Sequence, residues 1–337
     1  MHPNLTPLAF TENKAIDRIC LENNGCNPIR IAEMLVNVCR RNPFLKSIEY
    51  SKNKFEDINV AFSAMEDLTA IFDIHRQWNI WNISIESVAI TDSCPTPDVG
   101  DCVGEWLLGY AGVEGRGSYP PTRFFKVDLS SNHITGKSTI SSDHYLHDII
   151  SRDYGFEDLN LNGNMLDDTD AGLIAKALKR NRNLKRLSLK NNKIEEAGKS
   201  ALKDCISSTE SFQALYNCNH TCTIHLGEDD GDVLKNASRD EKMKSAILSS
   251  YSDGNLVRDL NAEFDDQRTC SPRLVPETIR AVVRRAWPHC QTSGWVHPST
   301  VQAQKSQLSM TYNLIKGFVV PKLRGSHEID LRLPRRQ

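Results

Sequence analysis

The chain of 337 residues is long enough for one large or two modest domains, and its 39% hydrophobic and 25% charged content is typical of a globular protein. A net charge of −2 and a pI of about 6.6 argue against a general nucleic-acid or membrane binder, which usually carries a strong basic excess. No apolar run approaches the ~18 residues of a membrane span, and the first residues lack a signal-peptide pattern. We therefore expect the ten cysteines to be reduced and the protein to be cytoplasmic, with the nucleus as the alternative.

A repeated pattern, L-x-x-L-x-L-x-x-N-x-L, organises the chain over about residues 16–222. The copies begin at Ile16, Leu45, Ile80, Phe124, Phe156, Leu184 and Phe212. The copy at Ile80 is degenerate, with Val88 where Asn is expected, and the copy at Phe212 decays. The fourth and sixth template positions are two residues apart, so a strand there directs both side chains to one side. The pattern predicts about seven strands, each buried on one face.

Between these strands the apolar spacing changes to that of a helix. Ala171, Ile174, Ala175 and Leu178 stand at i, i+3, i+4 and i+7, and three other connections show the same spacing. Each unit is therefore strand, turn, helix, turn. The expected fold is an α/β solenoid, with a curved parallel sheet inside and helices outside.

These motifs resemble leucine-rich repeats of the ribonuclease-inhibitor-like class, over about residues 16–222. The run at residues 211–222 is similar to a terminal element of predicted leucine-rich-repeat proteins abundant in diatoms, although Cys218 stands where Ser is usual. The resemblance implies a cap for the last open repeat. It also implies a protein that binds other proteins, without cofactor, rather than an enzyme.

One stretch, residues 92–122, exceeds the repeat period and is rich in Pro and Gly. We expect it to be an inserted loop on one rim of the solenoid, with a short helix near Trp106 and Tyr110. Those two aromatic side chains are candidate binding residues. The alternative is that they dock back onto the solenoid.

Beyond the repeats the composition changes. We expect a solenoid over residues 1–222, an acidic linker and small helical extension over 223–286, and a tail of low order over 287–337. Two short helices are predicted in the extension, near 240–250 and 276–286.

Candidate chemistry is sparse. Cys218, His220, Cys222 and His225 are metal-type ligands, but their alternate spacing suits a strand face better than a tetrahedral site. Residues 135–139, Thr-Gly-Lys-Ser-Thr, lack the first Gly of a phosphate-binding loop. No catalytic constellation emerges, so we predict no metal site, no cofactor and no enzyme. An enzyme with a site in 92–122 would require a deep pocket and a strongly shifted His or acid.

The concave sheet face is the leading candidate binding surface, because template positions 3, 5 and 7 point away from the core. Its charged candidates are the acidic Glu22, Glu49, Glu86, Asp128 and Asp158 and the basic Arg186 and Lys190. We predict a protein partner, and neither nucleic acid nor membrane. An ordinary solvated surface is the competing interpretation, and a regulatory or sensor fragment of a larger receptor-like system is the alternative function.

Overall fold

The computed structural model describes eight segments of the chain, residues 15–25, 27–42, 44–78, 85–108, 126–139, 144–152, 156–227 and 232–252. The described residues fall into two compact units. The first unit holds residues 15–209 and 217–238, and the second holds 210–216 and 239–252.

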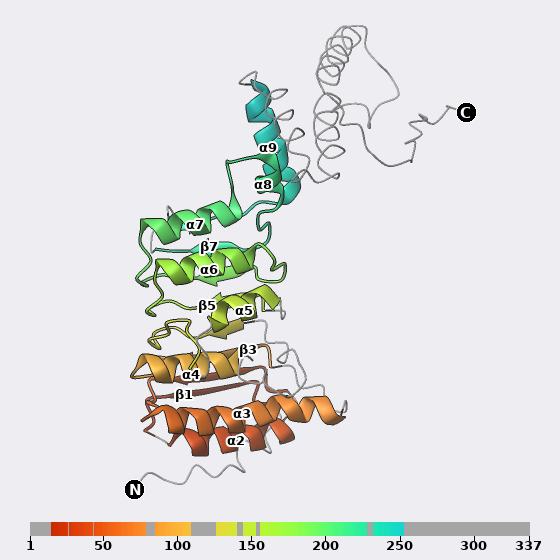
Figure 1. Cartoon of the computed structure of the whole chain (residues 1–337). Helices are drawn as coiled ribbons and strands as arrows, with labels where there is room; N and C mark the ends of the chain where they lie inside the picture. The colour runs from red at the N-terminus through yellow and green to blue at the C-terminus, as the bar shows by residue number, and fades with distance from the viewer. Residues whose placement is uncertain are drawn as a thin grey trace, which may run out of the picture. The chain divides into compact units, whose positions relative to one another are not determined.

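The first unit is built on an eight-stranded sheet whose strands follow chain order (Figure 1). Seven strands pair in parallel, namely β1 (Arg18–Glu22), β2 (Ser47–Ser51), β3 (Ser87–Thr91), β4 (Lys126–Asp128), β5 (Asp158–Asn160), β6 (Arg186–Ser188) and β7 (Thr223–His225). The last strand, β8 (Val233–Leu234), pairs antiparallel with β7. A mostly parallel sheet of this order is compatible with the predicted solenoid.

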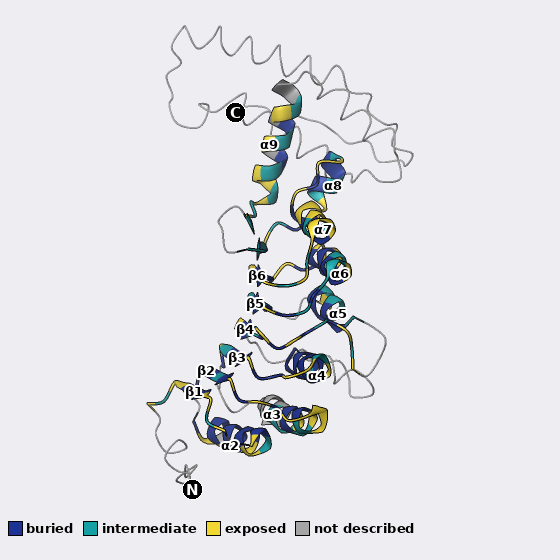
Figure 2. Ribbon diagram, turned by 90° about the vertical axis from the view of Figure 1, so that its left-hand side faces the viewer, coloured by how far each residue is buried: buried dark blue, intermediate teal, exposed yellow. Residues whose placement is uncertain are grey.

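Helices occupy the connections between the parallel strands. They are α2 (Pro28–Arg41), α3 (Ile58–Trp78), α4 (Pro97–Leu107), α5 (Tyr145–Arg152), α6 (Asp168–Leu178) and α7 (Glu196–Ile206). Figure 2 shows all six on one side of the sheet, with the strands along the opposite side. The sheet therefore has one face covered by these six helices and one face, called here the helix-free face, that none of the six covers.

The core lies between the sheet and the helices, as the repeat pattern predicted. In β6, Leu187 is fully buried while its neighbours Arg186 and Ser188 are not. One face of α6 carries Ala171, Ile174, Ala175 and Leu178, and all four are buried in this core. Burial of these apolar side chains is the main favourable contribution to the fold.

The Asn side chains of the template form hydrogen bonds that link neighbouring repeats. The Asn164 side-chain amide donates to the carbonyls of Leu129 and Leu161, both at 3.0 Å. Its Oδ1 accepts from the backbone amides of Asn132 and Ile134. One buried side chain thus satisfies four backbone groups where the chain bends off the strand. Asn53, Asn132 and Asn192 make corresponding bonds.

The third repeat corrects two predictions. Its strand is Ser87–Thr91, in a frame that begins at Ile85, so the predicted frame at Ile80 is wrong. The apolar run from Ile80 to Ile90 fits the template in two registers, and Ser93 holds the Asn position of the true one. As far as they are described, residues 92–122 are not an added loop, because 97–107 form α4, the repeat's own helix.

The seventh strand also differs from prediction. The frame at Phe212 is wrong, because residues 212–216 form the helix α8 (Phe212–Tyr216) and the strand is β7, beyond residue 222. Asn219 leads into β7: its amide donates to the Leu178 carbonyl at 2.7 Å, and its Oδ1 accepts from Cys222 N at 2.7 Å. Asn42 and Asn181 have the same role before β2 and β6.

The second unit contains α8 and α9 (Arg239–Ser252), so the helix predicted near 240–250 is confirmed. The Arg239 guanidinium lies 4.4 Å from the centroid of the Tyr216 ring, a cation–π contact. The second predicted helix and the predicted low-order tail lie outside the described residues. No helix in the described part of the chain is both long and apolar enough to cross a membrane.

Candidate binding surfaces

The helix-free face of the sheet is lined by side chains in two continuous rows. The strand register aligns Arg18, Ser47, Ser87, Lys126, Asp158, Arg186 and Thr223 in one row. It aligns Cys20, Glu49, Ala89, Asp128, Asn160, Ser188 and His225 in the other. These residues alternate with buried ones along each strand, so they point away from the core.

Three of the predicted acidic residues are paired with bases of a neighbouring repeat. Glu22 lies 2.6 Å from the Lys52 ammonium, and the hydrogen bond from Lys52 is the main cause that lowers the pKa of this carboxyl. Glu49 lies 2.5 Å from the Arg18 guanidinium. Glu86 is 3.6 Å from a lysine, but it stands just before β3 and not at a face position of the strand as predicted. Because these acids have partners, this end of the face carries mixed charge and is not simply acidic.

At the other end, the predicted residues form a second set of contacts. Arg186 donates through Nε and Nη2 to one oxygen of Asp158, at 2.9 and 2.7 Å. Asp128 accepts from the Asn160 amide at 2.8 Å. Lys190 follows β6 and is half-buried. The structure therefore places Arg186, Asp158 and Asp128 on one surface as members of cross-strand pairs, with Lys190 just beyond β6.

Between the two charged ends, the middle of the face carries small side chains. The corrected register of β3 brings Ser87, Ala89 and Thr91 here, next to Ser47 of β2. All four are partly exposed. This region presents Ser and Thr hydroxyl groups, and its small side chains leave space for the side chains of a partner.

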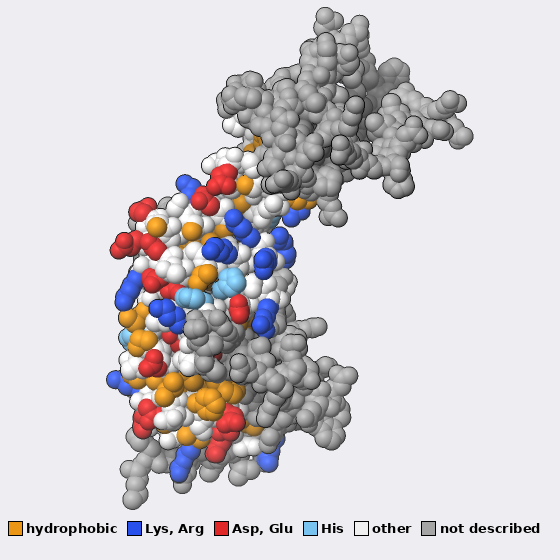
Figure 3. Space-filling model, viewed as in Figure 1, with side chains coloured by type: hydrophobic (Ala, Val, Ile, Leu, Met, Phe, Trp, Pro, Cys, Tyr) orange, Lys and Arg blue, Asp and Glu red, His pale blue; other side chains and the backbone are white. Residues whose placement is uncertain are grey.

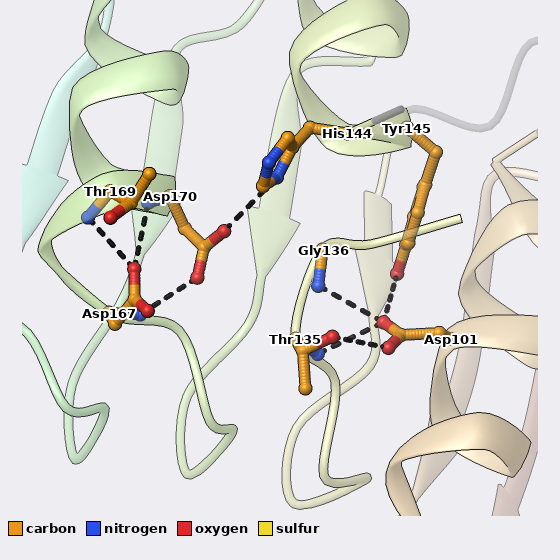
Figure 4. A network of polar contacts seen from close by, with 8 residues as sticks. All are labelled: Asp101, Thr135, Gly136, His144, Tyr145, Asp167, Thr169 and Asp170. Carbon is orange, nitrogen blue, oxygen red and sulfur yellow. Dashed lines mark hydrogen bonds and ion pairs between the residues drawn. The ribbon is translucent and has the colours of Figure 1, made fainter. Parts of the chain in front are cut away.

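A buried polar cluster connects α4 with the segment that follows β4 (Figure 4). Asp101 accepts from the backbone amides of Thr135 and Gly136, at 2.9 and 3.0 Å, and from the Thr135 hydroxyl at 2.6 Å. The Tyr145 hydroxyl of α5 donates to the same carboxylate at 3.3 Å. Glu105, one turn further along α4, accepts from the amide and hydroxyl of Thr139.

Two glycines of α4 make this approach possible. A Cβ on Gly100 would lie 1.9 Å from the Asn132 carbonyl oxygen, and a Cβ on Gly104 would lie 2.3 Å from the Tyr145 hydroxyl. Both positions therefore require a residue without a side chain. The pairs Gly100–Asp101 and Gly104–Glu105 are four residues apart, so they face the same segment.

The cluster has perturbed acidity but no open carboxylate. Burial is the largest effect on Asp101 and raises its pKa to about 6, although its hydrogen bonds act in the opposite direction. Both Asp101 oxygens accept hydrogen bonds from the chain, and Asp101 and Glu105 are 3% and 0% exposed. A shifted acid is thus present in residues 92–122, as the enzyme alternative required, but its bonds hold the 135–139 segment. In the segment that suggested a phosphate loop, the amides of Thr135, Gly136 and Thr139 donate to these internal carboxylates.

A second shifted acid lies at the start of α6. Asp167 caps this helix and Asp170 completes the capping box, where acids are favoured by the positive end of the helix dipole. Burial raises the pKa of Asp170 to about 6. Its Oδ1 lies 3.3 Å from Nδ1 of His144, while Oδ2 accepts from the Asp167 amide at 2.9 Å.

The described residues contain no group of three or more His, Cys, Asp or Glu side chains placed to hold a metal ion. Cys218 is buried and its sulfur donates to the Asp204 carbonyl and accepts from the Ser208 amide, both at 3.3 Å. Burial raises the pKa of the Cys222 thiol. All seven cysteines in the described segments are free thiols.

The two predicted aromatic candidates have different outcomes. Trp106 lies on α4, on the helix side, where its ring meets Phe62 edge-on at a centroid distance of 5.1 Å. Tyr110 lies outside the described residues. Trp106 and the sheet face are therefore on opposite sides of the sheet.

Sequence reasoning missed the pairing of the face acids and the carboxylates of α4. Acids at i and i+4 in the interior of a largely apolar helix, each preceded by Gly, were the signal for the buried cluster. For β7, the signal was Asn219 three residues before Cys222, which matches Asn42 before Leu45 and Asn181 before Leu184.

Comparison with known proteins adds little to this geometry. No protein-family model matches the sequence, and the search of curated proteins gives no significant match. Among solved structures, a chain described as "Leiomodin-1 Actin-Binding Site 2 (ABS2)" is similar at 11% sequence identity and a TM-score of 0.21. The match covers 78% of this chain and 94% of that chain. A similarity of this size carries no argument about function, so the candidate surfaces rest on the geometry above.

Proposed function

We propose that this chain is a leucine-rich-repeat protein of the ribonuclease-inhibitor-like class that binds a protein partner on the helix-free face of its sheet. The proposal includes a curved sheet with about seven repeats. It is a binding function and not a catalytic one. The similarity to diatom proteins and the cytoplasmic or nuclear location stay predictions from sequence.

The observation that carries the proposal is the aligned face of seven parallel strands, which none of the described helices of the repeats covers. Its side chains are held in register by the strands, and cross-strand pairs such as Arg186 with Asp158 fix their orientation. A surface that is ordered before binding loses less conformational entropy when a partner docks. The small residues in the middle leave space, and the charged ends can align the partner.

Two other interpretations follow from the sequence. A regulatory or sensor fragment of a larger receptor-like system would use the same face, so it differs in context and not in surface. An enzyme is less favoured, because the acids with raised pKa in α4 and α6 make bonds within the chain. We therefore propose a protein as the partner, and we propose no cofactor and no binding to nucleic acid or membrane.

Affinity capture with the full chain tests the proposal. The bait is compared with a variant that combines Ala89→Arg and Ser188→Arg on the sheet face, and with Ser200→Arg on α7 as a matched control. We expect a specific partner that the wild type and the control capture equally and the face variant loses. A partner retained by the face variant but lost by the control would move the binding surface to the helix side.

A further inference from the structure

An apolar patch lies on the helix side of the sheet, over the start of α3 and the end of α4. Figure 3 shows hydrophobic side chains gathered over these two helices, with acidic side chains around them. Ile58 and Phe62 are 38% and 44% exposed, and they are one helical turn apart on α3. The ring of Trp106 meets Phe62 edge-on and is itself only partly buried.

Phe62 is exposed and Trp106 is partly exposed, so an aromatic contact lies at the surface of two helices. Single exposed apolar residues are ordinary, but contiguous ones rimmed by polar groups mark sites of association. Phe62 and Trp106 come from two neighbouring helices, and tryptophan is among the residues that contribute most to binding. The geometry is that of a docking point and not of a solvated helix surface.

The two helices that carry the patch are acidic. The sequences of α3 and α4 contain six Asp and Glu but a single Lys or Arg, Arg76. Two of these acids, Asp101 and Glu105, are buried in the α4 cluster. Glu66, four residues after Phe62 on the same face of α3, and Asp98, in the first turn of α4, are exposed. Positive charge on a partner would therefore complement these exposed side chains.

We propose that the α3–α4 patch, formed by Ile58, Phe62 and Trp106 and rimmed by Glu66 and Asp98, docks a basic amphipathic helix of a partner protein. Apolar side chains of that helix pack on the aromatic pair, and its Lys or Arg residues pair with the acidic rim. Helices that dock in this way present apolar residues at i, i+3, i+4 and i+7. The patch is on the opposite side of the sheet from the face proposed above, so the two proposals stand or fall separately.

Selection from an unbiased peptide library tests the chemistry of the occupant. Random peptides of about 18 residues, long enough for five helical turns, are displayed on phage and selected on the immobilised full chain. They are counter-selected on the support without protein, and the enriched peptides are then measured on the wild type and on Phe62→Ser. We expect enriched peptides with net positive charge and helical apolar spacing. Phe62→Ser should weaken their binding by about tenfold or more.

Phe44→Ser is the matched control, because Phe44 is 56% exposed in the connection between α2 and β2. It should change the affinity less than twofold. The double variant Glu66→Lys, Asp98→Lys tests the charged rim and should also weaken binding. Circular dichroism checks that each variant is folded.

Three outcomes would overturn the proposal. The library could yield no enriched peptide, or only peptides without basic residues. The enriched peptides could bind Phe62→Ser as well as the wild type. Sedimentation could show a dimer that Phe62→Ser dissociates, which would assign the patch to a second copy, through the basic stretch 176–203 with its ten Lys and Arg.

Discussion

The repeats around α6 and α4 both have an Asn side chain bonded at the strand exit, but α4 adds two buried carboxylates that bind the next repeat. Near α6, Asn164 and Asn192 satisfy the backbone where the chain leaves each strand, and α6 needs only its capping box. Near α4, the Asn position holds Ser93, and two buried carboxylates bind the amides and hydroxyls of residues 135–139.

The difference shows how a repeat protein accommodates an irregular connection. The amides of 135–139 need acceptors, and Asp101 and Glu105 supply them from the helix. Gly136 of this segment lies against Leu146 of α5, so the cluster links neighbouring repeats where direct helix packing is interrupted. The arrangement has an energetic cost, since burial disfavours the charged form of Asp101.

The largest expected effect concerns the close approach at α4. Gly100→Ala should lower the free energy of unfolding by about 3 kcal/mol, because its Cβ would meet a backbone carbonyl that cannot move freely. Gly172→Ala in α6, where no atom lies within 4 Å, should instead raise it by about 0.5–1 kcal/mol. Urea denaturation of both variants checks this, and equal effects would mean that the two repeats pack alike.

Removing a template Asn should have the next largest effect. Asn164→Ala leaves buried backbone groups of two repeats without partners and should lower the free energy of unfolding by about 2–3 kcal/mol. Asn160→Ala, on the sheet face of the same repeat, should have less than half that effect. Thermal denaturation distinguishes the two variants. A small effect of Asn164→Ala would contradict the role of this side chain in linking neighbouring repeats.

The pH dependence of stability should separate the two kinds of repeat. The pKa of Asp101 is raised to about 6, while an unfolded Asp titrates near 3.9. Between about pH 4 and 6 the folded chain therefore binds more protons at this site, and its contribution to stability is lost as pH rises. Glu105 and Tyr145 lie beside Asp101, and both are kept in the Asp101→Asn variant that tests this expectation.

Asp101→Asn cannot ionise and lacks this loss. From pH 4 to pH 7 the difference in free energy of unfolding should shift by about 2 kcal/mol in favour of the variant. Gly172→Ala, which changes no ionisable group, is the control. Denaturation curves at several pH values measure the shift, and a constant difference would show that Asp101 is not the titrating group.

The smallest effect is expected on the sheet face. Arg186→Ala removes an exposed pair with Asp158 and should change the free energy of unfolding by less than about 1 kcal/mol. If the face serves recognition, the same substitution should alter partner binding more than stability. A loss of stability comparable to that of Asn164→Ala would mean that the Arg186–Asp158 pair serves stability and not recognition.

The regular parts of this fold were predictable because each position repeats the same physical demand. Leu159 and Leu187 mark the buried side of their strands, and Asn164 and Asn192 the exit from them. The register of the third repeat was not predicted correctly because Ile80, Ile83 and Ile85 allow two registers. A change of register moves every side chain to another position. The α4 cluster escaped because buried acids are identified by what they contact, which lies 34 residues away in the chain.

The candidate sheet face was predictable only as a set of positions. Glu49, Asp128 and Asp158 are where the template placed them, but their pairing with bases and amides depends on how neighbouring repeats align. The acidic character read from single residues therefore changes to a mixed ladder with a neutral centre. Trp106 was singled out for its residue type, and its contact with Phe62 came from packing of α3 and α4.

Site-specific photo-crosslinking tests the central claim, that the helix-free face binds a protein partner, most directly. A photoreactive amino acid is placed at Ala89 on β3 or, as the matched position, at Ser200 on α7. The account predicts that the captured partner crosslinks to the chain from position 89 and not from position 200. Crosslinks from position 200 alone would contradict it.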